Sequence, residues 1–334
     1  MVTIVDVAKR AGVGIGTVSR VLNDSPSVAE TTRAKVQAAI NELNYHPSPL
    51  AQGLKRGRTH TIVALVPFLT HPSSVERLQG LLPVLNDAGY TLVLRAVETL
   101  QQRDEHMTAM TRPHRADGDL IISLTPSAEE VEGFQSAGTR VVLIDAWHDQ
   151  LSCVVTDDIE GGRMAAQHLL GLGHRRVAFV GDEPDNAFGF VSSTQRLTGF
   201  TNALGEAGVT LPPGYVRTSP HGRDSARVLA TELLSLDEPP TAIFAASDTQ
   251  ALGVLEAAAA TSVQVPRELS VIGFDDIEIA AYTGLTTIRQ PLNVSGRLAA
   301  ELLLTSLAEP DAPARHETLP LELVERNTTG RHES

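Results

Sequence analysis

The sequence predicts an α/β protein in which a small helical N-terminal domain precedes a larger core built on parallel sheets. Two short amphipathic helices separated by glycines open the chain, and a third amphipathic helix follows them. From Thr61 onward, apolar runs with strand character alternate with amphipathic helices, which is the pattern of parallel sheets covered on both faces. The length of 334 residues suffices for two or three domains.

The first helix is predicted to begin after Thr3, which stands at capping-box spacing from Asp6. Gly12 is expected to end it, because glycine adopts the left-handed conformation at little cost. Four residues at i, i+3, i+4 and i+7 form its apolar face: Ile4, Val7, Ala8 and Ala11.

The second helix is predicted to begin after Gly14, an acceptable N-cap. Its buried face holds Val18, Val21 and Leu22. The residues expected to face outward are Ile15, Gly16, Ser19, Arg20 and Asn23. Two short helices joined by a glycine turn form a helix-turn-helix, whose second helix can enter the major groove of DNA. The alternative is a helical hairpin that only packs against another element.

The third helix has capping-box spacing at Ser27 and Glu30, although its start could lie two residues further on. Its apolar stripe is Val36, Ala39, Ile40 and Leu43, and Pro47 prevents its continuation. It would close a three-helix headpiece over residues 1–45. Residues 46–60 are basic and contain several Pro and Gly, which by itself indicates a linker.

The net charge of −13 is distributed unevenly along the chain. Residues 1–60 carry a formal charge of +4, so the remaining 274 residues carry −17. A small basic module attached to a large acidic body is expected when only one end of a protein meets phosphates.

Composition excludes several other classes of protein. The single cysteine, Cys153, rules out an internal disulfide, suits a reducing cytoplasm and makes a thiolate zinc site implausible. No run approaches 18 apolar residues, and no signal-peptide segment opens the chain, so we expect no membrane span and a cytoplasmic location.

The core is expected to hold two doubly wound subdomains, because its roughly sixteen alternating elements are too many for one sheet. Ligands of such sheets bind outside the carboxyl ends of the strands. The predicted strands are Ile62–Val66, Thr91–Arg95, Leu120–Ser123, Val141–Ile144, Val177–Val180, Ala242–Ala245, Ser270–Gly273 and Leu285–Ile288.

The segments Asp6–Ala8, Ala11–Val13 and Thr17–Asn23 closely resemble the headpiece of the lactose-repressor (LacI) family, and the resemblance continues through the chain. It implies a helix-turn-helix headpiece plus hinge, followed by a periplasmic-binding-protein-like core of two doubly wound parallel-sheet subdomains. The implied domains are the headpiece 1–45, the hinge 46–60 and the core 61–330, with lobe one at about 61–158 and 291–318 and lobe two at about 159–290 and 319–330.

The same resemblance implies which residues meet DNA. In the headpiece these are Thr3, Ile15, Gly16, Thr17, Ser19, Arg20 and Asn23, and in the hinge they are Leu50, Ala51 and Leu54. Leu54 would be the wedge that kinks the duplex from the minor groove. Gly53 costs a helix about 1 kcal/mol relative to Ala, so the hinge helix is expected to form only on DNA. Ser48 replaces the Asn that is usual in the family.

For the effector cleft, the resemblance singles out Asp145, Trp147, Ser192, Arg196, Asp248, Asp275 and Gln290. One guanidinium with several carboxylates suits a polyhydroxylated ligand, and sugars are the commonest effectors of the family. The alternatives are helix caps or surface salt bridges, and for Trp147 packing at the edge of a lobe. The aromatic residues usual in the family are missing near His71 and His221, so the ligand is not identified by the sequence.

Three function classes differ in how much of the sequence they explain. A periplasmic sugar-binding protein would explain only the core, and a sugar-active enzyme would need a catalytic or metal-binding motif that the sequence lacks. A DNA-binding regulator explains every segment. We therefore expect a repressor, not an enzyme, with no cofactor and no metal, whose partners are a pseudo-palindromic operator and a small effector, for which a carbohydrate is expected. No leucine heptads follow Leu323, so we expect a homodimer rather than a tetramer.

Overall fold

The computed structural model describes residues 2–45, 59–112 and 116–332. The chain divides into two compact units, Met1–His60 and Thr61–Ser334. The predicted hinge contacts Leu50, Ala51 and Leu54 lie outside the described residues. Within the described ranges, no helix is both long enough and apolar enough to cross a lipid bilayer.

The headpiece contains the three predicted helices, α1 (Ile4–Ala11), α2 (Ile15–Leu22) and α3 (Glu30–Glu42). The Thr3 N–H and hydroxyl both donate to Asp6 Oδ2, at 2.8 and 2.7 Å, and so fix the start of α1. Gly12 ends that helix at φ 66°, in the predicted left-handed conformation. The third helix begins after Ala29, two residues beyond the first possible cap. The buried core of the headpiece is Val7, Ala8, Val18, Val21, Val36, Ala39 and Ile40.

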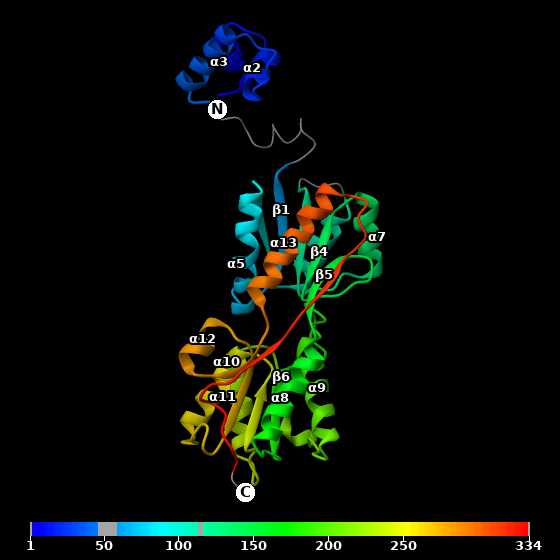
Figure 1. The fold of residues 1–334 in the computed structure, drawn as a ribbon, viewed down its shortest axis with the longest axis vertical. Coiled ribbons are helices and arrows are strands. Elements are labelled where there is room, and N and C mark those ends of the chain that lie inside the picture. The colour runs from blue at the N-terminus through cyan, green and yellow to red at the C-terminus, as the bar shows by residue number, and fades with distance from the viewer. Residues whose placement is uncertain (1, 46–58, 113–115, 333–334) are drawn as a thin grey trace. The chain divides into compact units, whose positions relative to one another are not determined.

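Lobe one contains a six-stranded parallel sheet with the order β11-β5-β4-β3-β1-β2. Its strands are β1 (Thr61–Pro67), β2 (Thr91–Val97), β3 (Gly118–Ile122), β4 (Val141–Ile144), β5 (Ser152–Thr156) and β11 (His316–Leu319). Helices cover both faces: α5 (Pro72–Asp87) and α13 (Leu292–Ala308) lie side by side on one, with α6 (Leu100–Met110) and α7 (Ala128–Ala137) on the other (Figure 1).

Lobe two repeats this plan in the order β12-β10-β9-β8-β6-β7, with only β12 antiparallel to its neighbour. Its strands are β6 (Val177–Asp182), β7 (Val216–Ser219), β8 (Ala242–Ala245), β9 (Ser270–Asp275), β10 (Thr286–Arg289) and β12 (Glu322–Val324). The helices α8 (Asp158–Gly171) and α9 (Ser192–Glu206) cover one face, and α10 (Arg223–Leu234) and α11 (Asp248–Ala260) cover the other, with α12 (Glu278–Thr283) leading into β10.

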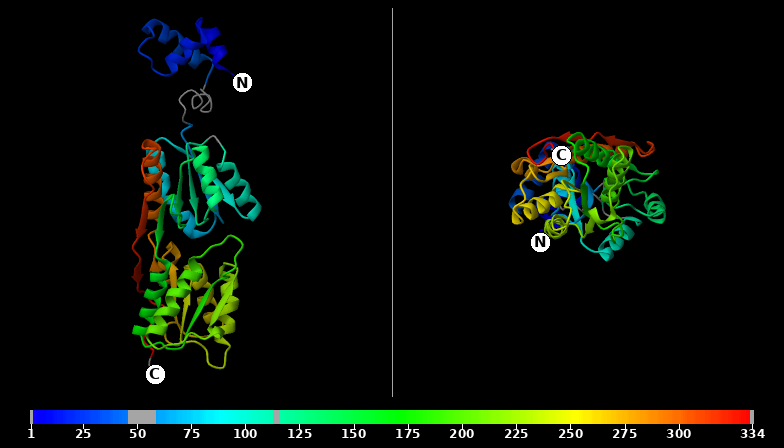
Figure 2. Two further views of the ribbon diagram at one scale, coloured as in Figure 1. Left: turned by 90° about the vertical axis from the view of Figure 1, so that its right-hand side faces the viewer. Right: turned by 90° about the horizontal axis from the view of Figure 1, so that it is seen from below.

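The chain passes between the lobes three times, after β5, after β10 and after β11 (Figures 1 and 2). All three crossings leave from the carboxyl ends of parallel strands. The carboxyl edges of the two sheets therefore face each other across an interlobe cleft, which is where ligands of such sheets bind.

All eight predicted strands are present; β4 and β8 have the predicted ends, and the others are shifted by one or two residues at one or both ends. Four further strands, β5, β7, β11 and β12, were not predicted. Three of them are short edge strands with half-buried residues, so they lack the continuous apolar run of a buried strand. The fourth, β5, follows β4 after the seven-residue connection 145–151 without an intervening helix, an unusually short link between parallel strands.

Each lobe contains a very close helix crossing that involves a helix with a cleft arginine. A Cβ added at Gly296 of α13 would lie 1.9 Å from the carbonyl oxygen of Arg77 on α5. In lobe two, a Cβ at Gly162 of α8 would lie 1.9 Å from the carbonyl oxygen of Arg196 on α9. Backbone contact at these glycines fixes the helix segment that carries an arginine toward the cleft.

Candidate DNA-binding headpiece and effector cleft

The outward face of α2 presents the residues predicted to meet base edges. Ile15 is 49% exposed at the start of the helix, and Gly16 and Arg20 are also exposed. Nothing lies within 4 Å of a Cβ built at Gly16, so this surface is open. Thr3, at the cap of α1, is exposed, and Thr17 is half-buried.

Ser19 corrects one expectation, because it was predicted to face outward but is only 8% exposed. The second helix packs against both α1 and α3, so its buried arc is wider than a single apolar stripe. The Ser19 carbonyl accepts a hydrogen bond from Asn23 Nδ2 at 2.6 Å, which ties the exposed Asn23 to its own helix.

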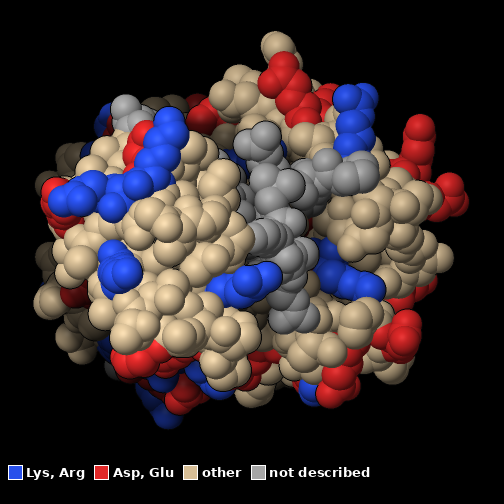
Figure 3. Space-filling model, turned by 90° about the horizontal axis from the view of Figure 1, so that it is seen from above, with Lys and Arg blue, Asp and Glu red and all other residues tan. Residues whose placement is uncertain are grey.

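The cations of the headpiece differ in their availability to DNA. Arg10 forms an ion pair with Glu42 at 2.6 Å, and Arg33 forms one with Asp24 at 2.9 Å. Arg20 is exposed and makes no ion pair with any other described residue. Figure 3 shows exposed Lys and Arg side chains together with exposed Asp and Glu side chains. Of the headpiece arginines Arg10, Arg20 and Arg33, Arg20 lies on α2 and is therefore the one placed for a two-bond contact with guanine.

In the core, the lobe-one side of the cleft is built around Asp145, which follows β4 with a positive φ of 59°. Its Oδ2 accepts a hydrogen bond from Ser123 Oγ at 2.7 Å and lies 3.2 Å from Nη2 of Arg77. Arg77 reaches the cleft from α5 and is 3% exposed. This carboxylate is therefore oriented by groups from two other elements.

The lobe-two side is built around Arg196, which is 6% exposed. Its Nε donates to Asp158 Oδ1 at 2.7 Å, and its Nη1 donates to the Ala246 carbonyl at 2.6 Å and lies 3.8 Å from Asp275 Oδ1. The guanidinium also lies 3.6 Å above the centre of the Phe274 ring, a cation–π contact.

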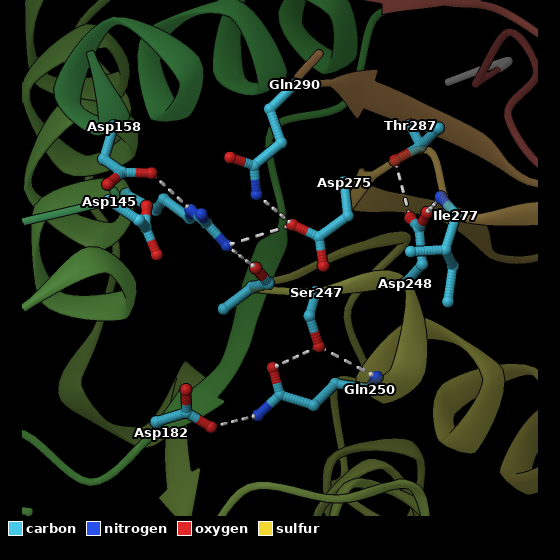
Figure 4. A network of polar contacts seen from close by, with 12 residues as sticks. Asp145, Asp158, Asp182, Ser247, Asp248, Gln250, Asp275, Ile277, Thr287 and Gln290 are labelled. Atoms are coloured by element: carbon cyan, nitrogen blue, oxygen red, sulfur yellow. Dashed lines mark hydrogen bonds and ion pairs between the residues drawn. The ribbon is translucent and has the colours of Figure 1, made fainter. Parts of the chain in front are cut away.

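Gln290, at the crossing after β10, joins the two sides. Its Nε2 donates to Asp275 Oδ1 at 2.6 Å, and its Oε1 accepts from Nη2 of Arg77 at 3.4 Å. Figure 4 shows the part of this network around Asp275, which contacts Gln290 and the guanidinium that also binds Asp158. Polar contacts therefore run without interruption from one lobe to the other.

Charge is concentrated in this network. Burial raises the pKa of Asp158 to about 6, although the Arg196 guanidinium acts in the opposite direction. Burial also raises the pKa of Asp275. Burial acts to lower the pKa of Arg196, but the surrounding carboxylates more than offset this and raise it. When Asp158 and Asp275 are ionised, their carboxylates can accept hydrogen bonds from ligand hydroxyl groups. The Arg196 guanidinium beside them stays charged.

A cavity of about 380 Å³ opens beside the network, between the lobes. Three predicted effector residues line it: Asp145, Trp147 and Ser192. Arg196, Asp275 and Gln290 do not line this cavity and are almost completely buried behind it. The lining residues Asp145 and Ser192 therefore place polar atoms at the cavity wall, and the buried Arg196 and Asp275 place charged groups behind it.

Asp248 has a different position from the other predicted residues. It is fully buried, and its two carboxylate oxygens accept from the Ile277 N–H at 3.0 Å and the Thr287 hydroxyl at 2.6 Å. The N-cap of α11 is Ser247, so Asp248 is not the helix cap that was the alternative. It holds the segments after β9 and in β10 in place, and a direct effector contact from Asp248 stays a prediction.

Three residues of the network were missed from the sequence: Arg77, Ser123 and Asp158. Arg77 lies within an amphipathic helix whose apolar pattern gave no sign of an inward-facing cation. The sequence predicts Ser123 as the last residue of a strand and Asp158 as the position of a lobe crossing. Ser123 follows a strand and Asp158 begins a helix, and these positions beside the cleft could have identified both as site residues.

One end of the cleft is occupied by rings from both lobes. Phe68 stacks on His71 with ring centres 5.0 Å apart, and it makes an edge contact with Phe188 at 5.2 Å. Phe188 stacks on Phe190 at 5.5 Å, and His71 lies 4.9 Å from His221. The segments in which the sequence lacks the family's usual aromatic residues thus contribute imidazole rings to this aromatic cluster.

A metal centre is not formed by the described residues: within them, no group of three or more His, Cys, Asp or Glu side chains is placed to hold an ion. The candidate sites are therefore the exposed face of α2 and the interlobe cleft.

Comparisons with known proteins agree with this arrangement. Residues 3–48 match the family described as bacterial regulatory proteins, lacI family, and residues 166–329 match a periplasmic binding protein-like domain. The chain is 36% identical over 333 residues to the ribose operon repressor of Escherichia coli (strain K12), covering 98% of this chain and 100% of that one.

Two solved structures are similar over nearly the whole chain. One is the lac repressor dimer bound to operator and the anti-inducer ONPF, with a TM-score of 0.85 and 26% identity over 98% of this chain and 99% of that one. The other is the complex of the transcriptional regulator CelR with cellobiose, with a TM-score of 0.72 and 30% identity over 98% of this chain and 100% of that one.

Proposed function

The chain belongs to the lacI family of bacterial regulatory proteins, and on that premise we propose that it is a repressor that releases its operator when a sugar or sugar derivative binds between the lobes. The curated relative it matches is itself a repressor of an operon. The proposal assigns the protein no catalytic step and places it in the cytoplasm, where bacterial DNA lies.

The observation that carries the DNA-binding role is the exposed face of α2. It presents an apolar side chain, Ile15, an open surface at Gly16, and the exposed Arg20. Arg20 would contact guanine through two hydrogen bonds, and Ile15 would contact a thymine methyl group. One short helix reads few base pairs, so we propose a homodimer on a pseudo-palindromic operator, the arrangement of other dimeric helix-turn-helix proteins.

The effector role is supported by the chemistry of the cleft. Asp145 and Ser192 line the cavity, and Arg196 and Asp275 lie behind it. Carboxylates accept hydrogen bonds from adjacent hydroxyl groups, and a guanidinium donates two parallel ones. A ligand that contacts both lobes would change their relative angle, and the resulting coupling to DNA binding is typically about 1–3 kcal/mol and reciprocal.

A DNA-binding titration tests the proposal. Operator affinity is measured by fluorescence anisotropy at one salt concentration, using the DNA upstream of the protein's own gene and a scrambled duplex of equal length. Arg20→Ala should weaken operator binding by about 1–3 kcal/mol, roughly 5- to 150-fold, with a smaller loss on scrambled DNA. The matched control is Arg223→Ala, an exposed arginine of lobe two, which should bind as the wild type does.

Equal operator and scrambled-DNA affinities for the wild type would contradict the DNA-binding role. The repressor mechanism is tested by adding sugars to the same titration. A sugar that binds the protein but leaves operator affinity unchanged would contradict the coupling. Light scattering that shows a tetramer at micromolar concentration would contradict the dimer.

A further inference from the structure

The cavity between the lobes has two chemically different ends. Its inner end is polar, with Asp145, Ser123 and Thr156 on the wall. Its outer end carries three exposed apolar side chains, Trp147 (47% exposed), Ile159 (42%) and Val191 (56%). Exposed apolar side chains gathered on one concave wall mark a binding surface more often than the same residues scattered singly.

Trp147 is held as a rigid platform. Its Nε1 donates to Asp149 Oδ1 at 3.0 Å, and its ring lies 4.4 Å from the ring of His316, at an angle of 36°. His316 is itself placed by a hydrogen bond between its Nε2 and the Leu151 carbonyl at 3.1 Å. The short connection between β4 and β5 carries this tryptophan directly beside Asp145, so the polar and the apolar ends are adjoining.

The inner end is built for hydroxyl groups. Asp145 Oδ2 is already oriented by Ser123 and Arg77. The buried Thr156 Oγ1 has no hydrogen-bond partner among the described residues, and Thr156 lines the cavity. A buried hydroxyl without a partner costs free energy, and a ligand hydroxyl would supply the missing bond.

The shape of the cleft sets the direction in which a ligand can extend. The aromatic cluster of Phe68, His71, Phe188, Phe190 and His221 packs between the lobes on one side of the cavity, where Phe190 forms part of the cavity wall. The open volume of about 380 Å³ lies on the Trp147 side, within the range of about 300–1,000 Å³ that is usual for small-molecule pockets.

From these observations we infer that the effector has two rings, a hydroxylated sugar at Asp145 and Thr156 and a second sugar ring that stacks on Trp147. This inference rests on the proposed function and makes the effector class more specific: a disaccharide rather than a monosaccharide. The apolar face of a sugar ring covers an aromatic ring, and a single ring bound at the inner end would leave Trp147, Ile159 and Val191 in water.

The composition of the chain provides a direct test, because Trp147 is its only tryptophan. The full-length protein is titrated with matched probes, glucose with cellobiose and maltose, and galactose with lactose, by calorimetry and by tryptophan fluorescence. At least one disaccharide should bind at least about 10-fold more tightly than its monosaccharide, a difference of about 1.4 kcal/mol that lies within the range of stacking on an aromatic ring. Only the disaccharide should shift the tryptophan emission.

Two variants complete the test. Trp147→Ala should reduce the preference for the disaccharide to about threefold or less. Tyr282→Ala, which removes an aromatic ring that is 77% exposed and does not line the cavity, should keep the full preference. The inference is overturned if monosaccharides bind as tightly as disaccharides, if the preference survives Trp147→Ala, or if none of the sugars binds.

Operator titrations with the same protein separate this inference from the proposed function. A monosaccharide that releases the operator overturns the two-ring inference and supports the sugar-responsive repressor. A disaccharide that binds at Trp147 without changing operator affinity supports the two-ring site and contradicts the repressor mechanism.

Discussion

The imidazole rings of His71 and His221 lie 4.9 Å apart, although 150 residues separate them in the sequence and they come from opposite lobes. Nδ1 of His221 lies 3.0 Å from Asp182 Oδ1, and that carboxylate also accepts from Gln250 Nε2 at 2.8 Å. Burial, and to a smaller extent the neighbouring His221, lower the pKa of His71 to about 4. For His221, burial acts downward but Asp182 outweighs it and raises the pKa. In this pair, His71 therefore tends to stay neutral, and His221 is the ring that can be protonated.

This pair predicts a loss of stability in acid. The unfolded state takes up a proton on His71 near pH 6.5, whereas the folded state resists it down to about 4. The stability contributed by His71 is therefore complete above pH 6.5 and is lost as the pH falls toward 4. His71→Phe should remove this dependence. The free energy of unfolding should then fall by about 1–2 kcal/mol less between pH 7 and pH 4.5 than it does in the wild type, after allowance for the partly solvated ring. Urea unfolding at pH 7 and pH 4.5 measures it.

His221 provides the opposite control. Its pKa is raised in the folded state, so its contribution is complete below its unfolded pKa and is lost as the pH rises through the folded value. His221→Gln should therefore lower the free energy of unfolding at pH values below the unfolded pKa and leave it unchanged once the pH exceeds the folded value. An acid loss that is unchanged in His71→Phe would contradict the role of that ring.

Arg196 is expected to be essential for the stability of the core as well as for the effector. Arg196→Met would leave Asp158 and Asp275 buried without their guanidinium, which typically costs about 3–5 kcal/mol. Adding Asp158→Asn should recover part of that loss, because one uncompensated charge is removed. Chemical denaturation of the two single variants and the double variant gives the coupling energy. Additive losses would show that the ion pair at 2.7 Å contributes little.

The helix crossing of lobe two provides a matched pair of glycines on α8. Gly162→Ala would push a Cβ into the Arg196 carbonyl at 1.9 Å, so it should destabilise the core by about 1–3 kcal/mol or more and shift α9. Gly171→Ala, on the same helix with nothing within 4 Å of the new Cβ, should be neutral or stabilising by up to about 1 kcal/mol. Thermal unfolding compares the two, and equal effects would contradict the close crossing.

Gly16 separates the stability of the headpiece from recognition. A Cβ at Gly16 meets no atom within 4 Å, so Gly16→Ala should stabilise α2 by up to about 1 kcal/mol. The same methyl group would project from the face of α2 proposed to read bases, and should change the preference among operator sequences. Circular dichroism and a panel of operator variants test both parts. A gain in stability with an unchanged preference would remove Gly16 from the DNA interface.

The sequence allowed the helices and central strands to be predicted because their apolar residues are periodic. Val36, Ala39 and Ile40 form the expected stripe, and the continuous run of β1 belongs to a strand buried on both faces. The edge strands β11 and β12 escaped prediction because their partly exposed residues carry no such signal. Pairing with distant strands, rather than local preference, makes them strands.

The site was only partly predictable for a related reason. The alternation of elements predicts where strands end beside a cleft, and the resemblance to the LacI family singled out Asp145 and Asp275 at two of these ends. Whether a side chain lines the cavity or lies beneath it depends on packing between segments that are far apart in sequence. Asp248 and Trp147 both lie near strand ends, yet the first is enclosed by Ile277 and Thr287 and the second borders the cavity.

The pairing of β11 with β5, and of α13 with α5, has a consequence for synthesis on the ribosome. Lobe one begins at Thr61, but the helix and edge strand that complete it come from residues 292–319. Vectorial folding, in which the N-terminal part matures first, is therefore blocked for this core until nearly the whole chain has emerged. A chain cut short before α13 would expose the apolar surface that Leu302 and Leu303 cover, and cellular proteases should degrade such a nascent fragment.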